Sequence, residues 1–256
     1  AATFSNNVTV SCNLAVGSSA NASGTYASVA GGASNTASGA CSFVGGGTLN
    51  TASGIRSMVG GGYCNTATNT QSTIAGGREN TSSAVYSSIG GGLQNLVSAN
   101  YAAIVGGSYN TGSAAHSFVG GGNCNVASNN CAAVVGGLCN TASGLYSFAG
   151  GGKYSLASNC WATVAGGCLN CSTQPWSTVG GGSNNKACGA YTVVAGGANN
   201  TASGYISVVT GGNSNSSTGT YSSIGGGVSN LASCYAAVVG GGQGNTASGY
   251  RSTVSG

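Results

Sequence analysis

Charged side chains are nearly missing from this sequence. Of its 256 residues, five are Lys or Arg, one is Glu and none is Asp, so 2% are charged, against roughly 25% in an ordinary globular domain. Proton-transfer catalysis needs titratable groups, and a nucleic-acid-binding surface needs clustered cations. The cations here are spread along the chain, at Arg56, Arg78, Lys153, Lys186 and Arg251. We therefore predict that the protein is not an enzyme and has no nucleic-acid partner.

Long apolar runs are also missing. None approaches the roughly 18 residues of a membrane span, so we expect no membrane insertion. Glycine fills 50 positions but does not recur at every third one, which excludes collagen. An apolar content of 41% with little charge is the opposite of a disordered composition. No leader-like segment is visible at the N-terminus, so we expect a mature chain or a fragment.

The sequence instead contains a strict repeat of 15 residues. A typical unit reads Gly-Gly-x-x-Asn-Thr-Ala-Ser-Gly-x-Tyr-Ser-x-Val-Gly, and its first Gly is called position 1 below. Position 155, where the series would require Asn, is Ser. The repeat is anchored by an Asn column at position 5: Asn35, Asn50, Asn65, Asn80, Asn95, Asn110, Asn125, Asn140, Asn170, Asn185, Asn200, Asn215, Asn230 and Asn245.

A unit of 15 residues cannot fold alone, but stacked units can bury a shared core. Helical repeats are longer, and a Gly-Gly pair in each unit would break a helix. We predict an all-β fold, a parallel β-solenoid in which each 15-residue unit is one turn. Residues 1–16 would form an N-terminal lead-in strand or partial turn, and residues 17–256 the solenoid.

Two strands are expected in each turn. Positions 11–15 alternate in polarity, which predicts a half-buried strand with positions 12 and 14 inward. Positions 5–8 form the second strand, with Asn and Ala at positions 5 and 7 on its inner face. The Gly-Gly pair and the Gly-rich position 9 are expected at the corners, since positive φ costs glycine little.

The Asn column is interpreted as architecture. Its carboxamides are expected to bond from turn to turn as a ladder about 4.8 Å apart. An Asn chosen for its tolerance of left-handed φ in a turn is the alternative.

Aromatic side chains recur at position 11. A column of large residues outside a thin core suggests a surface that packs against a partner, and we favour self-association; an exposed stripe without a partner is the alternative. Its members are Tyr26, Tyr86, Tyr101, Tyr146, Trp161, Trp176, Tyr191 and Tyr221.

Eleven cysteines are present, at scattered positions of the repeat. Only Cys124 and Cys139 share a position in adjacent turns, and a neighbour about 4.8 Å away is within disulfide range. They are the candidate disulfide, although the geometry of parallel strands can forbid it. Cys168 and Cys171 form a single CxxC, a poor zinc signal without a second pair. We expect no metal and no cofactor.

Units such as Val44-Gly45-Gly46-Gly47-Thr48-Leu49-Asn50-Thr51-Ala52-Ser53-Gly54 resemble the head repeats of trimeric autotransporter adhesins and the repeat shafts of phage and viral tail fibres. The strand from Ser57 to Gly61 resembles the inner strand of that family, and residues 3–17 resemble the first strands of viral fibre proteins. The resemblance implies a left-handed β-roll and a threefold-symmetric homotrimer. The membrane anchor, coiled-coil stalk and self-cleaving chaperone domain found in such proteins are missing, which suggests a fragment or a separate filament subunit.

Three functions compete. The first is a non-enzymatic structural or adhesive fibre, extracellular, as a cell-surface filament or on a virion, with a host-surface glycan or protein as a candidate partner for Tyr63, Tyr109, Tyr154 and Tyr205. The second is an ice- or crystal-binding solenoid that uses Thr-x-Ser at positions 6 and 8, although Leu96, Val126, Leu156, Lys186 and Leu231 interrupt position 6. The third, a β-helix enzyme or calcium-binding solenoid, lacks the required charged residues.

Overall fold

The structure, a computed structural model, describes residues 12–256. It contains two compact units, residues 1–107 (unit 1, described from residue 12) and residues 108–256 (unit 2). Both are built from two-residue strands joined by turns, and residues 12–256 contain no helix. In all, about 16 turns form a parallel β-solenoid.

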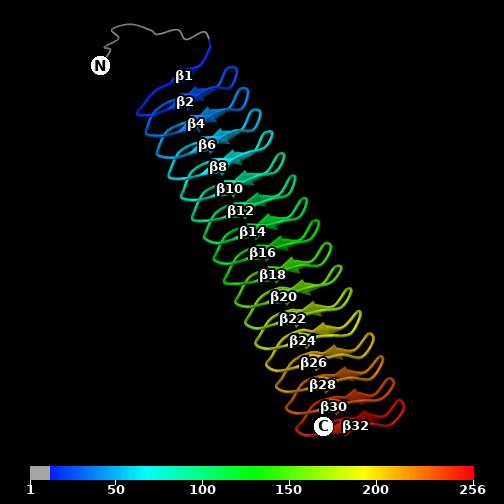
Figure 1. Cartoon of the computed structure of the whole chain (residues 1–256). Coiled ribbons are helices and arrows are strands. Elements are labelled where there is room, and N and C mark those ends of the chain that lie inside the picture. Colours follow the sequence, from blue (N-terminus) through cyan, green and yellow to red (C-terminus); the bar gives the residue numbers. More distant parts are fainter. Residues whose placement is uncertain (1–11) are drawn as a thin grey trace. The chain divides into compact units, whose positions relative to one another are not determined.

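In unit 1 the even-numbered strands lie one after another, and Figure 1 shows them stacked in chain order. They are β2 (Asn21–Ala22), β4 (Thr36–Ala37), β6 (Thr51–Ala52), β8 (Thr66–Ala67), β10 (Thr81–Ser82) and β12 (Leu96–Val97). The odd-numbered strands form the second sheet of the unit: β1 (Leu14–Ala15), β3 (Ser28–Val29), β5 (Phe43–Val44), β7 (Met58–Val59), β9 (Thr73–Ile74), β11 (Ser88–Ile89) and β13 (Ala103–Ile104).

Unit 2 repeats this plan. Its even-numbered strands are β14 (Thr111–Gly112), β16 (Val126–Ala127), β18 (Thr141–Ala142), β20 (Leu156–Ala157), β22 (Cys171–Ser172), β24 (Lys186–Ala187), β26 (Thr201–Ala202), β28 (Ser216–Ser217), β30 (Leu231–Ala232) and β32 (Thr246–Ala247). Its odd-numbered strands are β15 (Phe118–Val119), β17 (Ala133–Val134), β19 (Phe148–Ala149), β21 (Thr163–Val164), β23 (Thr178–Val179), β25 (Val193–Val194), β27 (Val208–Val209), β29 (Ser223–Ile224), β31 (Val238–Val239) and β33 (Thr253–Val254).

The pairing is parallel and keeps equivalent residues opposite each other. Thr36 pairs with Thr51, which pairs with Thr66. A third line of parallel bridges runs through position 3, for example from Ala33 to Thr48. The first turn is one residue shorter than the others, because Leu14 pairs with Ser28 and not with a residue 15 positions later. Of the expected lead-in segment 1–16, only residues 12–16 are described, so its resemblance to viral fibre strands mostly lies outside the described residues.

The core is a narrow stack of small side chains. Positions 7, 12 and 14 are buried, as in Ala52, Ser57 and Val59. The prediction that positions 12 and 14 face inward is therefore confirmed. One Val or Ile per turn is the largest buried side chain, and it lies opposite its equivalent in the next turn. Where position 7 is Ser, it bonds the hydroxyl at position 12, as Ser82 bonds Ser87 at 2.6 Å.

The expected strand over positions 11–15 is wrong in length. Only positions 13 and 14 are strand, and position 11 lies in a turn with left-handed φ, 60° at Tyr101. Position 4 is also left-handed, with φ 57° at Cys64. These non-glycine residues turn their N–H groups toward the preceding turn: Arg56 N–H donates to Ala40 O at 2.8 Å. Strand residues donate forward instead, as Thr36 N–H does to Asn50 O.

Positive φ occurs at the glycines of position 2, whereas position 9 is Asn or Ala in other turns, such as Asn69 and Ala84. Gly47 has φ 84°, and a Cβ there would lie 2.1 Å from Gly62 O and 2.8 Å from the Asn50 amide nitrogen. Position 9 glycines such as Gly54 do not have positive φ, contrary to the expectation for the corners. The chain bends at positions 4 and 11 because backward hydrogen bonds there offset the cost of a left-handed L-residue.

Candidate functional surfaces

The Asn column lies inside the turns and is fully bonded along most of its length. The Asn50 carboxamide donates to Gly46 O at 2.9 Å and to Gly62 O at 2.8 Å, and its Oδ1 accepts the backbone N–H of Asn65 at 3.0 Å. Direct amide-to-amide bonds occur in addition at some steps, such as Asn65 to Asn50 at 3.1 Å. Asn50 is 0% exposed. The carboxamides thus bind backbone more often than each other, and a buried, saturated amide has no capacity for a ligand.

Ser155 interrupts the column. Its N–H donates to Asn140 Oδ1 at 2.9 Å, but its hydroxyl is buried without a partner. Serine has no carboxamide, so the backbone N–H of Asn170 lacks the Oδ1 acceptor that an Asn at position 155 would supply.

Glycosylation sequons in the Asn column are buried with it. Asn80, Asn170 and Asn215 are each 0% exposed, whereas the sequon residue Asn21 is exposed. The column therefore hides these three sequons. The sequon at Asn7 lies outside the described residues.

Position 11 aromatics stand at the turn between the two sheets, and most are half exposed. In unit 1, Tyr26 is 68% exposed, and Tyr86 and Tyr101 stack at 5.1 Å between ring centroids. In unit 2, Tyr146, Trp161, Trp176 and Tyr191 stack in sequence, with planes within 17° of parallel. The left-handed backbone at this position directs each ring out of the strand, so the rings can meet along the turn.

Sequence periodicity missed three members of this stack. Tyr205, Tyr235 and Tyr250 occupy position 10, not 11, yet their rings continue the unit 2 series through Tyr221. Each precedes a non-aromatic residue at position 11: Ile206, Ala236 and Arg251. Reading positions 10 and 11 together would have found them.

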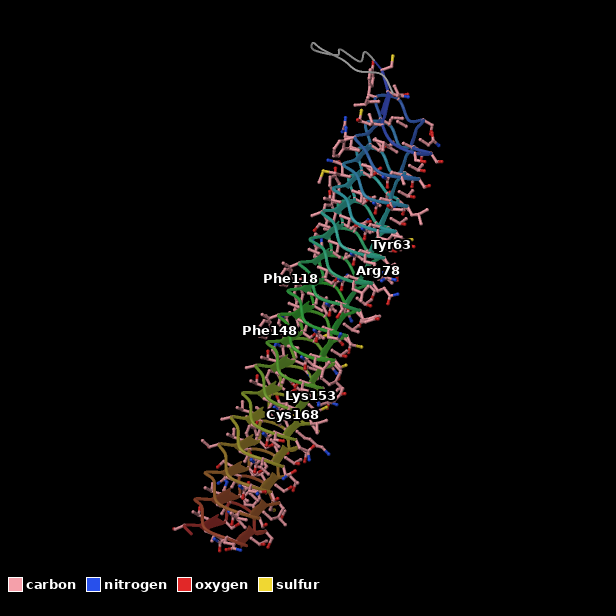
Figure 2. The ribbon with its side chains drawn as sticks, turned by 90° about the vertical axis from the view of Figure 1, so that its left-hand side faces the viewer. Tyr63, Arg78, Phe118, Phe148, Lys153 and Cys168 are labelled. Atoms are coloured by element: carbon pink, nitrogen blue, oxygen red, sulfur yellow. The ribbon has the colours of Figure 1, made fainter. Side chains whose placement is uncertain are left out.

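The outer face of the odd-numbered sheet carries no charge in the described chain. In unit 2, Phe118 and Phe148 lie along the same side of the ribbon (Figure 2) and are 39% and 38% exposed. Each ring lies against a glycine two residues on, since a Cβ at Gly120 would be 3.5 Å from Phe118 and one at Gly150 would be 3.1 Å from Phe148. The rings therefore lie flat on the sheet.

Three of the six charged side chains lie at positions 3 and 4, namely Arg78, Glu79 and Lys153. Arg78 lies 5.6 Å from the Tyr63 ring centroid and bonds the Glu79 carboxylate at 2.8 Å, and Gln94 donates to the same carboxylate at 2.6 Å (Figure 2). These hydrogen bonds, Arg78 first, lower the pKa of Glu79. In unit 2, Lys153 lies 5.0 Å from the Tyr154 ring centroid. In the Arg78–Glu79 pair the Arg78 side chain is 65% exposed and that of Glu79 is 27% exposed.

All eleven cysteines are free thiols in the structure. Cys124 and Cys139 are neighbours, and Cys139 N–H donates to Asn123 O at 2.9 Å. Partial burial raises the pKa of Cys139 most. A hydrogen bond with Cys124 and the charge of Cys124 raise it further, while the charge of Lys153 lowers it. Burial likewise raises the pKa of Cys171, with Cys188 adding to the effect. The Cys124–Cys139 disulfide stays a prediction.

Hydroxyl side chains line the outer face of the even-numbered sheet in unit 1. Thr36, Thr51, Thr66 and Thr81 lie opposite one another in four adjacent strands. Ser38, Ser53, Thr68 and Ser83 follow two residues later in the same turns. In unit 2, Thr201 pairs with Lys186 and Ser216, so the threonine row is broken there.

Within residues 12–256, no group of three or more His, Cys, Asp or Glu side chains could together hold a metal ion. The same residues include no helix long and apolar enough to cross a bilayer. His116 occupies the left-handed position 11 of its turn, with φ 58°.

In sequence comparisons, no protein-family model and no curated protein matches this chain.

Proposed function

We propose that this chain is a non-enzymatic subunit of an extracellular structural or adhesive fibre. Its turns would be 15 residues long throughout and left-handed, and three parallel copies would associate as a homotrimer. A cell-surface filament and a virion fibre are both compatible with this architecture.

One observation carries the proposal. Within each unit the same backbone bonds, Asn contacts and Val stack recur in turn after turn, while the groups able to do chemistry are few and dispersed. Such a repeat extends in one dimension and presents a surface of constant spacing. A spacer or a multivalent binding surface needs these properties, whereas an active site needs a local departure from them.

The native mass tests this function. Sedimentation equilibrium of the full chain should give three times its 24.1 kDa mass, independent of salt because charge is scarce. A monomer at every concentration would contradict the fibre subunit.

Adhesion to a glycan or protein would use exposed tyrosines outside the position 11 series. Tyr63, Tyr109 and Tyr154 are 44%, 51% and 49% exposed, and Tyr is a common anchor of binding surfaces. Tyr205 no longer belongs with them, since its ring contacts Tyr191 and Tyr221. Glycan-array binding that is lost in Tyr109→Ala would support adhesion, and no binding to any glycan or cell-surface extract would leave a purely structural fibre.

Ice or crystal binding is the second candidate, favoured by the in-register threonine row of unit 1. Thr66→Lys would place a charge in the middle of that row, whereas Thr201→Lys alters a threonine already flanked by Lys186. If the row binds ice, thermal hysteresis is present in the parent chain, is lost in Thr66→Lys and persists in Thr201→Lys. Absence of thermal hysteresis in the parent chain removes this candidate.

A further inference from the structure

Unit 2 contains a continuous series of eight aromatic rings, here called the aromatic column. Neighbouring centroids are between 4.8 and 6.1 Å apart along its whole length. The first four rings are stacked, the next three steps are edge-to-face, and the last is stacked. Its members are Tyr146, Trp161, Trp176, Tyr191, Tyr205, Tyr221, Tyr235 and Tyr250.

The column is maintained where the strict repeat fails. Tyr205, Tyr235 and Tyr250 stand one residue early, in turns whose position 11 is not aromatic. The ring, rather than the repeat position, is thus what all eight turns have in common. In unit 1, by contrast, Cys41, Arg56 and Gln71 separate Tyr26 from Tyr86.

The chain itself leaves this column uncovered. Exposure ranges from 39% at Tyr235 to 65% at Tyr250. An aromatic side chain can bury about 150–250 Å², so the exposed parts of eight rings together amount to about 800 Å². One partner in a stable protein interface buries a similar area, about 800 Å².

Ring orientation indicates what could cover it. The faces of Trp161 and Trp176 are occupied by their neighbours on both sides, with planes 7° apart at 5.2 Å. A ligand that stacks face-on, such as a sugar ring, therefore finds no free face there. The exposed ring edges instead form an aromatic ridge in which six of the eight rings carry a hydroxyl, and such rings suit packing against other side chains.

The spacing of the rings favours a second copy of this chain, and little charge lies near the column to oppose it. Unit 2 contains three cations, Lys153, Lys186 and Arg251, and no acid. Of these, Arg251 lies beside the column, 5.2 Å from the Tyr250 ring centroid. A parallel copy with its turns aligned offers rings at the same spacing along the same length, so each ring meets an equivalent one.

We propose that the aromatic column is the surface through which copies of this chain contact one another, side by side, parallel and with turns in register. The proposal rests on the homotrimeric fibre above and names its contact surface. The columns of the copies meet along a common axis and exclude water from the ring edges.

Tryptophan fluorescence reports directly on this contact. The chain has two Trp residues, Trp161 and Trp176, and both belong to the column. In the assembled protein their emission should be blue-shifted and protected from acrylamide. On dilution, emission should shift to the red in step with the loss of mass measured by sedimentation.

A matched pair of variants locates the contact. Tyr191→Ser with Tyr221→Ser removes two rings that are 43% and 46% exposed; Tyr109→Ser with Tyr154→Ser removes two that are 51% and 49% exposed elsewhere in unit 2. All four have left-handed φ, so the backbone cost of substitution is matched. Association of the column variant should be at least about tenfold weaker, so that it dissociates at a concentration at least about tenfold higher than the parent chain does. The control should dissociate at the same concentration as the parent chain.

Several outcomes decide the proposal. Equal association of both variants, with Trp emission unchanged on dilution, would place the contact elsewhere and leave the homotrimer standing. A monomeric parent chain would remove homotrimer and contact together. If the serine variant fails to fold by circular dichroism, Tyr191→Phe with Tyr221→Phe must retain association, and the dilution-dependent Trp shift of the parent chain decides.

Discussion

At the scale of single residues, every complete turn before residue 241 places two non-glycine side chains in the left-handed region. An L-residue there costs roughly 1–2 kcal/mol, because Cβ approaches the following carbonyl. Position 4 and position 11 accept this cost in turn after turn, since their N–H groups then bond the preceding turn. The strain is therefore a regular part of the fold rather than the mark of one special site.

Glycine should stabilise these positions and destabilise others. Ser229 is exposed with φ 55°, whereas Ser233 is exposed with ordinary negative φ. We expect Ser229→Gly to raise the free energy of unfolding by about 0.5–1 kcal/mol and Ser233→Gly to lower it by a similar amount. Denaturant unfolding measures both, and a loss of stability in both variants would contradict the strain.

Ser155 offers a stabilising substitution. In Ser155→Asn, a carboxamide would accept Asn170 N–H and donate to the glycine carbonyls that the other Asn residues bind. We expect a gain of about 1–2 kcal/mol, the net value of one or two hydrogen bonds. The reverse change, Asn200→Ser, removes three bonds and should lose at least as much. Thermal unfolding of the two variants checks the opposite signs.

Cys139 should react according to its neighbours. Its pKa is raised by partial burial and by Cys124, and Lys153 opposes this. Alkylation requires the thiolate. Cys124→Ala should lower the pKa of Cys139 and speed its alkylation at pH 8, whereas Lys153→Gln should raise the pKa and slow it. Mass spectrometry of Cys139 between pH 7 and 10 measures this, and identical rates in both variants would contradict the assignment.

At the scale of elements, each strand is only two residues long, so its stability comes from the strands above and below it. One residue of each odd-numbered strand from β3 to β31 is buried in the core, and in β19 it is Ala149 rather than Val or Ile. Its partners Val134 and Val164 are both fully buried. The aliphatic stack is therefore thinnest at this turn.

Ala149→Val should restore the stack. Two added methyl groups, at about 0.8 kcal/mol each, predict a gain of about 1–1.5 kcal/mol. Val164→Ala in the adjacent strand should cost about 2 kcal/mol, since it also leaves a cavity. Urea unfolding compares the two, and destabilisation by Ala149→Val would mean that the backbone has closed over the missing volume.

At the scale of the whole molecule, the scarcity of charge predicts an unusual indifference to pH and salt. Glu79 is the one carboxylic side chain, and Arg78 and Gln94 lower its pKa below 4.5. Its contribution to stability is present above its unfolded pKa and disappears as pH falls through the lowered folded value. Exposed pairs of this kind contribute little.

We therefore expect Tm to change by less than about 4 °C between about pH 7 and about pH 3. We expect an equally small change between about 0.05 M and about 1 M salt. Circular dichroism melting curves measure it, and Glu79→Gln serves as the control that lacks the carboxylate. Acid unfolding near pH 4 in both proteins would show that another titration governs stability.

Residue identity and spacing alone predict the repeat, the parallel strands and the inward positions. A 15-residue spacing puts Asn, Ala and Val each opposite its own kind, and burial of small apolar side chains leaves few alternatives. The scarcity of charge likewise limits the chemistry that the side chains can perform. These inferences depend on identity and spacing, which a sequence contains in full.

Where the chain bends and which rings touch become visible only in the folded chain. Periodicity placed the aromatics in a strand and the corners at glycine, because it cannot detect a left-handed residue held by a hydrogen bond to the preceding turn. It also separated Tyr205, Tyr235 and Tyr250 from the column, since a side chain one residue out of phase can still reach the same ring stack. Backbone direction and side-chain reach are three-dimensional quantities, and both become fixed when the turns are stacked.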